Sequence, residues 1–233
     1  MRTAAILPVK SFAIAKQRLG ASVADSTRLG LASAMVGDVL AALHATAAID
    51  QVIVVTREPP VATAARQLGA IVVPDGEEAG QSAAALLGLE RAVAEGMERA
   101  LLVPGDCPAL EPAELAALLA RTPDAPAEVV IVPDRHGTGT NGLLLSPPHV
   151  ISPSFGPGSC ARHSELAATA GASCRVEQLP SLLLDIDTGE DLAELRERLA
   201  SGVSERSGGS PEGLPAARTR AALDRLMGTA SAA

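Results

Sequence analysis

A chain of 233 residues, 47% of them apolar, has the length and the core material for one substantial α/β domain, alone or with an appendage. Its formal net charge of -8 and its aromatic content of 1% disfavour a general nucleic-acid binder, which needs a basic surface and rings for base stacking. The three cysteines, Cys107, Cys160 and Cys174, are odd in number and widely spaced, which disfavours a disulfide framework or a cysteine-held metal.

The apolar runs of the chain are too short to span a membrane. The N-terminus also lacks the long apolar region of a signal peptide. We therefore expect a soluble, cytoplasmic protein that binds neither a membrane nor nucleic acid.

The first predicted strand covers residues 3–9 and reads as buried. The loop that follows it contains Lys10, Lys16 and Arg18, and the two lysines are the only ones in the chain. An ammonium group is a common phosphate ligand, so the loop suggests phosphate binding, although two surface lysines placed by chance would give the same pattern. Because it has no glycine before Gly20, it is neither a Walker loop nor a dinucleotide-binding loop.

Strands and helices then alternate. The periodicity predicts a helix over 25–44, a strand over 51–56, a short helix over 60–68, a strand over 70–73 and a helix over about 80–95. Gly80, Gln81 and Ser82 stand at the start of the last helix, where free N–H groups and short polar side chains can meet a ligand. Ordinary N-capping explains Ser82 equally well.

A short apolar run, 100–103, predicts a central buried strand that Pro104 and Gly105 end. Asp106 therefore stands at the carboxyl end of this strand, where open α/β sheets bind ligands and where a carboxylate can hold a divalent cation against phosphate oxygens. Taken alone, the stretch equally fits a solvated or capping Asp. A helix over about 111–120 and a strand over 128–133 follow.

Two glycine-rich segments come next. In the first, glycines alternate with Thr138, Thr140 and Asn141 ahead of a strand over 143–146, an arrangement that lets the backbone approach a ligand and supplies neutral hydrogen bonds. His136, a lone loop histidine, is given no catalytic role.

In the second, a Gly-Pro-Gly turn over 156–158 leads into a helix opened by Ser159, with Arg162 and His163 in its first turns. Such a helix start suits a phosphate or carboxylate, and it is also an ordinary helix start.

Asp185 and Asp187 follow an apolar run and point the same way along an extended segment. Thr188 can cap a helix over 190–199. One of these carboxylates would complete a Mg²⁺ site begun by Asp106, because Mg²⁺ is commonly held by one or two carboxylates plus substrate phosphates. Asp187, nearest the helix start, is the first choice.

From residue 201 the composition changes to that of a flexible linker, rich in Ser and Gly. Residues 215–227 fit a short amphipathic helix, packed on the domain or on a partner, and equally fit a disordered tail. The predicted division is therefore a domain over 1–200 and a linker with a C-terminal tail over 201–233.

Five motifs, each weak alone, together resemble one family. They are Leu7-Pro-Val-Lys10 with Lys16-x-Arg18-Leu19, Val103-Pro-Gly-Asp-Cys-Pro108, Gly139-Thr-Asn141, Phe155-Gly-Pro-Gly-Ser159 with Arg162-His163, and Leu184-Asp-Ile-Asp-Thr188. In this order they resemble the 2-phospho-L-lactate / phosphoenolpyruvate guanylyltransferases of deazaflavin coenzyme F-420 biosynthesis, over residues 3–199. The resemblance implies an α/β fold of the nucleotidyltransferase A (Rossmann-like) type, a three-layer sandwich with a mostly parallel central sheet.

The resemblance also implies an activity, the transfer of GMP from GTP to phosphoenolpyruvate or 2-phospho-L-lactate with release of pyrophosphate. The chain looks bacterial, which favours phosphoenolpyruvate, and relatives suggest a homodimer. The implied catalytic residues are Lys10, Lys16, Arg18 and Asp106, with Asp106 and Asp187 holding Mg²⁺. The implied nucleotide contacts are Pro8, Lys10, Lys16, Gly80, Ser82 and Gly105. The implied phospho-acid contacts are Thr140, Asn141, Gly156, Ser159 and Arg162.

Two departures from the family pattern are Gln81-Ser82, where the family tends to have Leu-Asn, and Asn141, where related bacterial sequences more often have Thr. Two other functions stay open at this point. One is a nucleotidyltransferase of the same fold with another acceptor such as molybdopterin, against which the missing Gly-rich first loop counts. The other is a non-catalytic nucleotide-binding module, against which the three aspartates count.

Overall fold

The computed structural model describes residues 1–12, 25–121, 125–205 and 215–230. The strands are β1 Thr3–Val9, β2 Gln51–Thr56, β3 Ile71–Pro74, β4 Arg99–Leu102, β5 Glu128–Pro133, β6 Thr140–Ser146 and β7 Ser173–Val176. The helices are α1 Asp25–Ala45, α2 Pro59–Gln67, α3 Gln81–Ala94, α4 Pro112–Ala120, α5 Ser159–Thr169, α6 Gly189–Glu205 and α7 Ala217–Ala230, with a short 3-10 helix η2 over Pro180–Leu182.

All seven strands form one sheet in the order β3-β2-β1-β4-β6-β5-β7. Only β6 runs antiparallel to its neighbours β4 and β5, so the predicted mostly parallel sheet is confirmed. The chain first adds β2 and β3 on one side of β1 and then places β4 on the other side. The carboxyl ends of β1 and β4 therefore form a topological switch point, the position at which open α/β sheets bind ligands.

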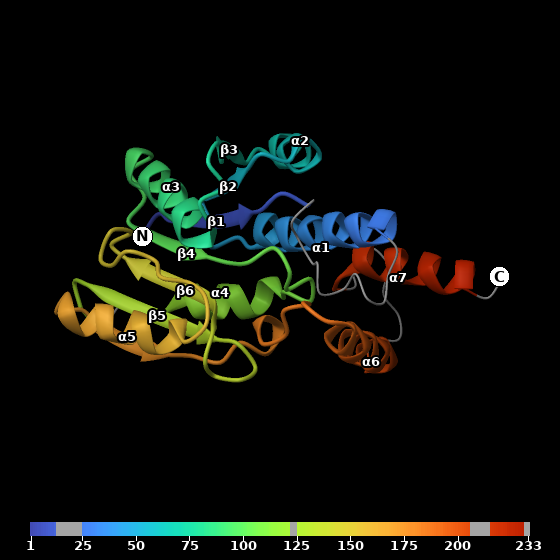
Figure 1. Ribbon diagram of the computed structural model, residues 1–233. Coiled ribbons are helices and arrows are strands. Elements are labelled where there is room, and N and C mark those ends of the chain that lie inside the picture. Colours follow the sequence, from blue (N-terminus) through green and yellow to red (C-terminus); the bar gives the residue numbers. More distant parts are fainter. Residues whose placement is uncertain (13–24, 122–124, 206–214, 231–233) are drawn as a thin grey trace.

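Helices cover both faces of the sheet, as the predicted three-layer sandwich requires (Figure 1). Along β1, Ala5 and Leu7 face a core that includes residues of α1, α2 and α4. Ala4 and Ile6 point to the opposite core, which includes residues of α3 and α5. This alternation follows from the two-residue period of a strand, and it explains why the strand reads as continuously apolar.

Several elements differ from the sequence prediction, and η2 was not predicted. The strand predicted over 143–146 begins at Thr140, and the helix predicted over 190–199 continues to Glu205. The strand β7 was not predicted, because its four residues, Ser-Cys-Arg-Val, alternate between half-buried and exposed positions and form no apolar run.

A third core lies between α1, α6 and α7, formed by apolar residues such as Leu31, Leu195 and Leu223. In Figure 1, α7 lies beside α1. The segment Arg28–Ala45 of α1 is long and apolar enough, by length and composition, to cross a membrane, and 56% of it is buried in the fold. Its apolar residues pack against the sheet and against α7, as those of a core helix do.

Candidate active site

Two adjoining cavities open at the carboxyl ends of β1 and β4. The apolar pocket, about 230 Å³, is lined by residues such as Pro8, Phe12, Met35 and Gly105. The polar cleft, about 800 Å³, extends from there to the start of β6 and of α5. Lys10, Gln81, Pro104, Asp106 and Asp187 line both cavities. One ligand can therefore reach from the apolar pocket into the polar cleft past a lysine and two carboxylates.

Asp106 and the segment 185–187 are joined through the backbone, because the N–H of Ile186 donates to the Asp106 carbonyl oxygen at 3.0 Å. Ile186 is fully buried, while Asp185 and Asp187 are half-buried and line the polar cleft with Asp106. The alternation predicted for this extended segment therefore brings three carboxylates to one corner of the cleft. We call Asp106, Asp185 and Asp187 the acidic corner.

Negative charge gathers around Asp185 in the acidic corner. Burial raises the pKa of Asp185, and the negative charges of Asp106 and Asp187 raise it further, against the opposing hydrogen bond from Asn141. That bond joins the Asn141 amide to Asp185 Oδ1 at 3.3 Å, and the same amide donates to the Leu182 carbonyl at 2.8 Å. Carboxylates held this close favour a cation or a proton between them.

The backbone at Asp187 is fixed by Asp191, in the first turn of α6. Asp191 Oδ2 accepts from the N–H groups of Asp187 at 2.9 Å and Thr188 at 2.7 Å, while Thr188 Oγ1 accepts from the Asp191 N–H at 3.2 Å. Thr188 thus caps α6 as predicted. Although burial alone would raise it, the pKa of Asp191 is lowered by these hydrogen bonds and by the charge of Arg135.

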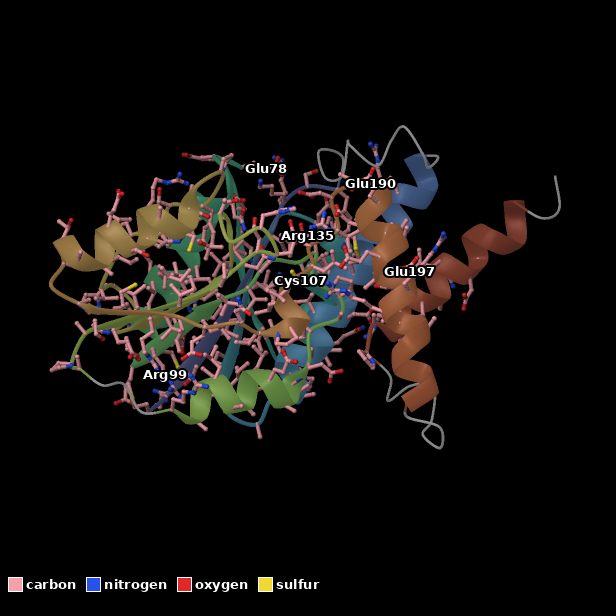
Figure 2. The ribbon with its side chains drawn as sticks, turned by 90° about the horizontal axis from the view of Figure 1, so that it is seen from below. Glu78, Arg99, Cys107, Arg135, Glu190 and Glu197 are labelled. Carbon is pink, nitrogen blue, oxygen red and sulfur yellow. The ribbon has the colours of Figure 1, made fainter. Side chains whose placement is uncertain are left out.

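Arg135, in the loop between β5 and β6, joins this loop to α6. Its guanidinium forms ion pairs with Asp191 at 2.5 Å and with Glu194 at 2.8 Å. Figure 2 labels Arg135. Its backbone N–H donates to the carbonyl of Leu183 at 3.0 Å. Arg135 was not predicted as a site residue, because the sequence shows it only as a cation beside the glycine-rich segment.

On the predicted nucleotide side, Lys10 lines both cavities, and Pro8 and Gly105 line the apolar pocket. Lys16 and Arg18 lie outside the described residues. The backbone beyond Lys10 is held by two carboxylates: Ser11 N–H donates to Glu78 at 3.0 Å and Phe12 N–H donates to Glu58 at 2.7 Å.

Gly80 and Ser82 do not line either cavity, whereas Gln81 between them lines both. Ser82 Oγ instead accepts a hydrogen bond from the Phe155 N–H at 2.9 Å. This places Ser82 as a link between the start of α3 and the loop before α5. Of the two residues that depart from the family pattern here, Gln81 faces the site and Ser82 does not.

Thr140, Asn141, Gly156 and Ser159, predicted to bind the phospho-acid, all line the polar cleft. Ser159 is 1% exposed, and its Oγ has no hydrogen-bond partner among the residues that the structure describes. It lies at the N-terminus of α5, where the helix macrodipole favours an anion. The N–H groups of Ser159 and Cys160 already donate to the carbonyls of Gly156 at 3.0 Å and Thr138 at 3.1 Å. Gly156, with a φ of 110°, adopts a backbone conformation that side chains rarely allow and forms the turn before the helix.

Comparison with known proteins identifies the family. A family model described as "Guanylyl transferase CofC like" matches residues 3–199. The phosphoenolpyruvate guanylyltransferase of Conexibacter woesei is 48% identical over 229 residues, which cover 98% of each chain. The chain belongs to the CofC-like guanylyltransferase family. The resemblance drawn from the five motifs is thereby confirmed. The phosphoenolpyruvate guanylyltransferase of Sphaerobacter thermophilus is 36% identical over 90% of this chain and 100% of its own.

Solved structures of other nucleotidyltransferases share the fold of this guanylyltransferase family member. A nucleotidyl transferase from Methanothermobacter superposes with a TM-score of 0.61 at 21% identity, covering 86% of this chain and 99% of the other. A cytidylyltransferase from Leptospira borgpetersenii superposes with a TM-score of 0.58 at 14% identity, covering 99% and 96%. The predicted nucleotidyltransferase fold is therefore confirmed.

On the phospho-acid side of this guanylyltransferase, one predicted contact lies outside the polar cleft. Arg162 does not line the cleft; its guanidinium turns back onto the loop before α5. It donates to the carbonyl oxygens of Ser154 at 2.9 Å, Phe155 at 3.2 Å and Gly156 at 3.4 Å, and also to that of Pro157. The physical reason is that this tight turn directs its carbonyl groups towards α5, where a fork of N–H donors satisfies them. Arg162 thus shapes the loop that carries Gly156.

Proposed function

We propose that this chain transfers GMP from GTP to phosphoenolpyruvate and releases pyrophosphate, in deazaflavin coenzyme F-420 biosynthesis. The named activity of relatives up to 48% identical supports this acceptor, and 2-phospho-L-lactate is the alternative within the family resemblance. The observation that carries the proposal is the layout of the polar cleft. It is lined by the acidic corner and also by the α5 N-terminus, whose buried Ser159 hydroxyl has no described partner.

The acceptor's phosphate fits the α5 end of the cleft. The hydroxyls of Ser159 and Thr140 are neutral hydrogen-bond donors, and the macrodipole of an 11-residue helix favours a negative charge there. The triphosphate of GTP fits beside Lys10, Asp106 and Asp187, which line both cavities. Lys16 and Arg18 stay predicted ligands of that triphosphate.

A Mg²⁺ ion fits the acidic corner, and Asp106 and Asp187 would hold it, with Asp185 beside them. The donor set suits this ion, since Mg²⁺ takes oxygen ligands and usually has one or two carboxylates plus substrate phosphates. In the described part of the chain, no group of three or more His, Cys, Asp or Glu side chains forms a metal site by itself. Bound there, the ion would neutralise charge on the phosphates of GTP.

The chemistry then needs alignment more than proton transfer. A phosphate oxygen of the acceptor is already anionic and forms the bond to the α-phosphorus of GTP, while the bond from that phosphorus to the pyrophosphate oxygen breaks. Lys10 is placed to stabilise charge on the phosphates, and the α5 N-terminus holds the nucleophile in position. This reaction requires no general base.

The test is pyrophosphate release with GTP and Mg²⁺, offering phosphoenolpyruvate, 2-phospho-L-lactate and 3-phosphoglycerate separately. Release with phosphoenolpyruvate alone or in clear preference is the expected result. If a folded protein that binds GTP released no pyrophosphate with any of the three acceptors, the proposal would be overturned. The cytoplasmic location and the homodimer are also proposed, and analytical ultracentrifugation tests the dimer.

A further inference from the structure

His163 is fully buried on α5, one helical turn after Ser159, and connects two parts of the polar cleft. Its Nε2 lies 2.9 Å from the backbone nitrogen of Ser154, just before the loop that carries Gly156. Its Nδ1 lies 3.0 Å from Oγ1 of Thr140, the first residue of β6. The imidazole therefore bridges the two elements from which the acceptor contacts come.

The contacts determine where the ring carries its proton. The backbone N–H of Ser154 can only donate, so Nε2 of His163 accepts and carries no hydrogen. Burial lowers the pKa of His163 to about 4, with the nearby charge of Arg162 as a second cause, so the ring is neutral at neutral pH. Nδ1 of the neutral ring must then carry the hydrogen, and it donates to Thr140 Oγ1.

This arrangement fixes the direction of the Thr140 hydroxyl. Because its oxygen accepts from His163, its own hydrogen has to find a different acceptor. Among the residues that the structure describes, Thr140 Oγ1 makes no second hydrogen bond, and Thr140 lines the polar cleft. The hydroxyl is thus ready to donate to a ligand in the cleft.

We propose that His163 is a positioning residue that holds the Thr140 hydroxyl as a hydrogen-bond donor to the phosphate of the acceptor. The inference rests on the proposed function for the identity of the ligand. An anionic phosphate oxygen only accepts hydrogen bonds, so a Thr140 hydroxyl that gave its hydrogen to the ring would present lone pairs to the phosphate. The Nδ1–H form of His163 prevents that arrangement. Arg162, the preceding residue on the same helix, holds the adjacent loop by donating to the carbonyl groups of that loop.

The kinetic test is a double-mutant cycle between His163 and Thr140, measured by pyrophosphate release with varied phosphoenolpyruvate. His163→Leu is expected to raise KM for phosphoenolpyruvate about tenfold, the effect of misplacing one hydrogen bond to a charged group, and to leave KM for GTP unchanged. His163→Asn is similar in size to the Leu variant and keeps an amide donor near the Nδ1 position, so it is expected to stay within about threefold of the wild type.

In a Thr140→Val background, His163→Leu is expected to change KM for phosphoenolpyruvate by less than about twofold, because the hydroxyl through which it acts is gone. If the tenfold effect persists in that background, His163 acts through Ser154 or through packing, and the proposal is wrong. An unchanged KM in the single His163→Leu variant would also overturn it.

A measurement on the wild-type chain covers the case in which the variants do not fold. With ¹⁵N-labelled histidine, one of the four histidines is expected to stay neutral with hydrogen on Nδ1 between about pH 5.5 and 8, where exposed histidines titrate. Its Nδ1 signal is expected to shift when phosphoenolpyruvate is added. An Nε2–H form, or ordinary titration of all four rings, would overturn the inference. If the wild type used none of the three acceptors, the proposed function would fail, while the ring's tautomer would still be decided.

Discussion

Asp38 on α1 caps the first turn of α7, from a position 181 residues earlier than its partner Thr219. Asp38 Oδ2 accepts from the Thr219 N–H at 2.8 Å and from the Thr219 hydroxyl at 2.7 Å, and Oδ1 accepts from the Arg218 N–H at 3.0 Å. Both Asp38 and Thr219 are buried. The unpaired N–H groups of the helix start are thereby satisfied by the domain, which fixes α7 to α1.

Asp38→Ala is expected to lower the free energy of unfolding by about 1–2 kcal/mol, the usual effect of removing a helix cap. Asp38 lies outside both cavities, so kcat and KM are expected to be unchanged. Urea denaturation measures the loss, and trypsin cleavage at the arginines of α7 is expected to become faster. Asp224→Ala, at an exposed position of α7, is the matched control and should leave stability as it was. An identical urea midpoint for Asp38→Ala would show that the cap does not hold α7.

The acidic corner could be predicted because its signals are local. The strand that delivers Asp106 is an uninterrupted apolar run ended by Pro-Gly, and Asp185 and Asp187 flank a single apolar residue in an extended segment. Those patterns depend on the two-residue period of a strand and on the switch point of the sheet. The glycine turn and Ser159 could likewise be placed at a helix start, whereas the grouping of Thr140 and Asn141 with them came from the family resemblance.

The remaining contacts depend on distant parts of the chain. Asp38 became a cap only because α7 packs back onto α1, and His163 is buried against Thr140, which comes from the start of β6. Arg162 and Ser82 each find a partner in the loop that precedes α5. The type of a polar side chain shows which groups it can hydrogen-bond to. Tertiary packing decides whether that partner is a ligand or a loop of the protein itself.

Ser159→Ala is expected to raise KM for phosphoenolpyruvate about tenfold without lowering stability. Its buried Oγ has no described partner to lose, so removing the hydroxyl should leave the free energy of unfolding unchanged or raise it by about 1 kcal/mol. Initial rates and thermal denaturation measure the two effects. Ser164→Ala is the control on the same helix, because Ser164 does not line the cleft. Its Oγ donates to the Cys160 carbonyl at 3.1 Å and accepts from the Cys174 thiol at 3.9 Å. A Ser159→Ala variant with normal KM would remove this hydroxyl from the acceptor site.

Asp106→Asn and Asp187→Asn are each expected to lower kcat about a hundredfold or more, since each removes a charged oxygen proposed as a Mg²⁺ ligand at the site of GMP transfer. The Mg²⁺ concentration for half-maximal activity is expected to rise in both variants. Glu90→Gln, an exposed carboxylate on α3, controls for the loss of one negative charge. Full Mg²⁺-dependent turnover in Asp106→Asn would disprove the metal assignment.

Asp185→Asn is expected to make the metal-free protein more stable at neutral pH. The folded state raises the pKa of Asp185. The protonated side chain therefore stabilises the folded state below the ordinary carboxyl pKa, and this stabilisation is lost as the pH rises through the raised pKa. The ionised carboxylate therefore opposes folding at pH 7, and Asn removes that cost while keeping an oxygen for the Asn141 amide. Urea denaturation in chelator should show an advantage for the variant that shrinks as the pH falls to about 4.

Added Mg²⁺ should also shrink this advantage, because it stabilises the wild type at the acidic corner. A wild type that is more stable than Asp185→Asn at pH 7 in chelator would contradict the prediction. It would mean that the hydrogen bond from Asn141 outweighs the burial of the charge and its repulsion by Asp106 and Asp187.

Asp191→Ala is expected to raise the Mg²⁺ concentration for half-maximal activity about tenfold. Asp191 accepts hydrogen bonds from the backbone N–H groups of Asp187 and Thr188 and so fixes the backbone of Asp187, whose carboxylate is proposed to bind the metal. At saturating Mg²⁺, the KM values for GTP and phosphoenolpyruvate should change little. Glu194→Ala is the matched control, since Glu194 shares the ion pair with Arg135 but makes none of these backbone contacts. If both variants raise the Mg²⁺ requirement equally, the Arg135 ion pairs, and not the cap on Asp187, position the metal site.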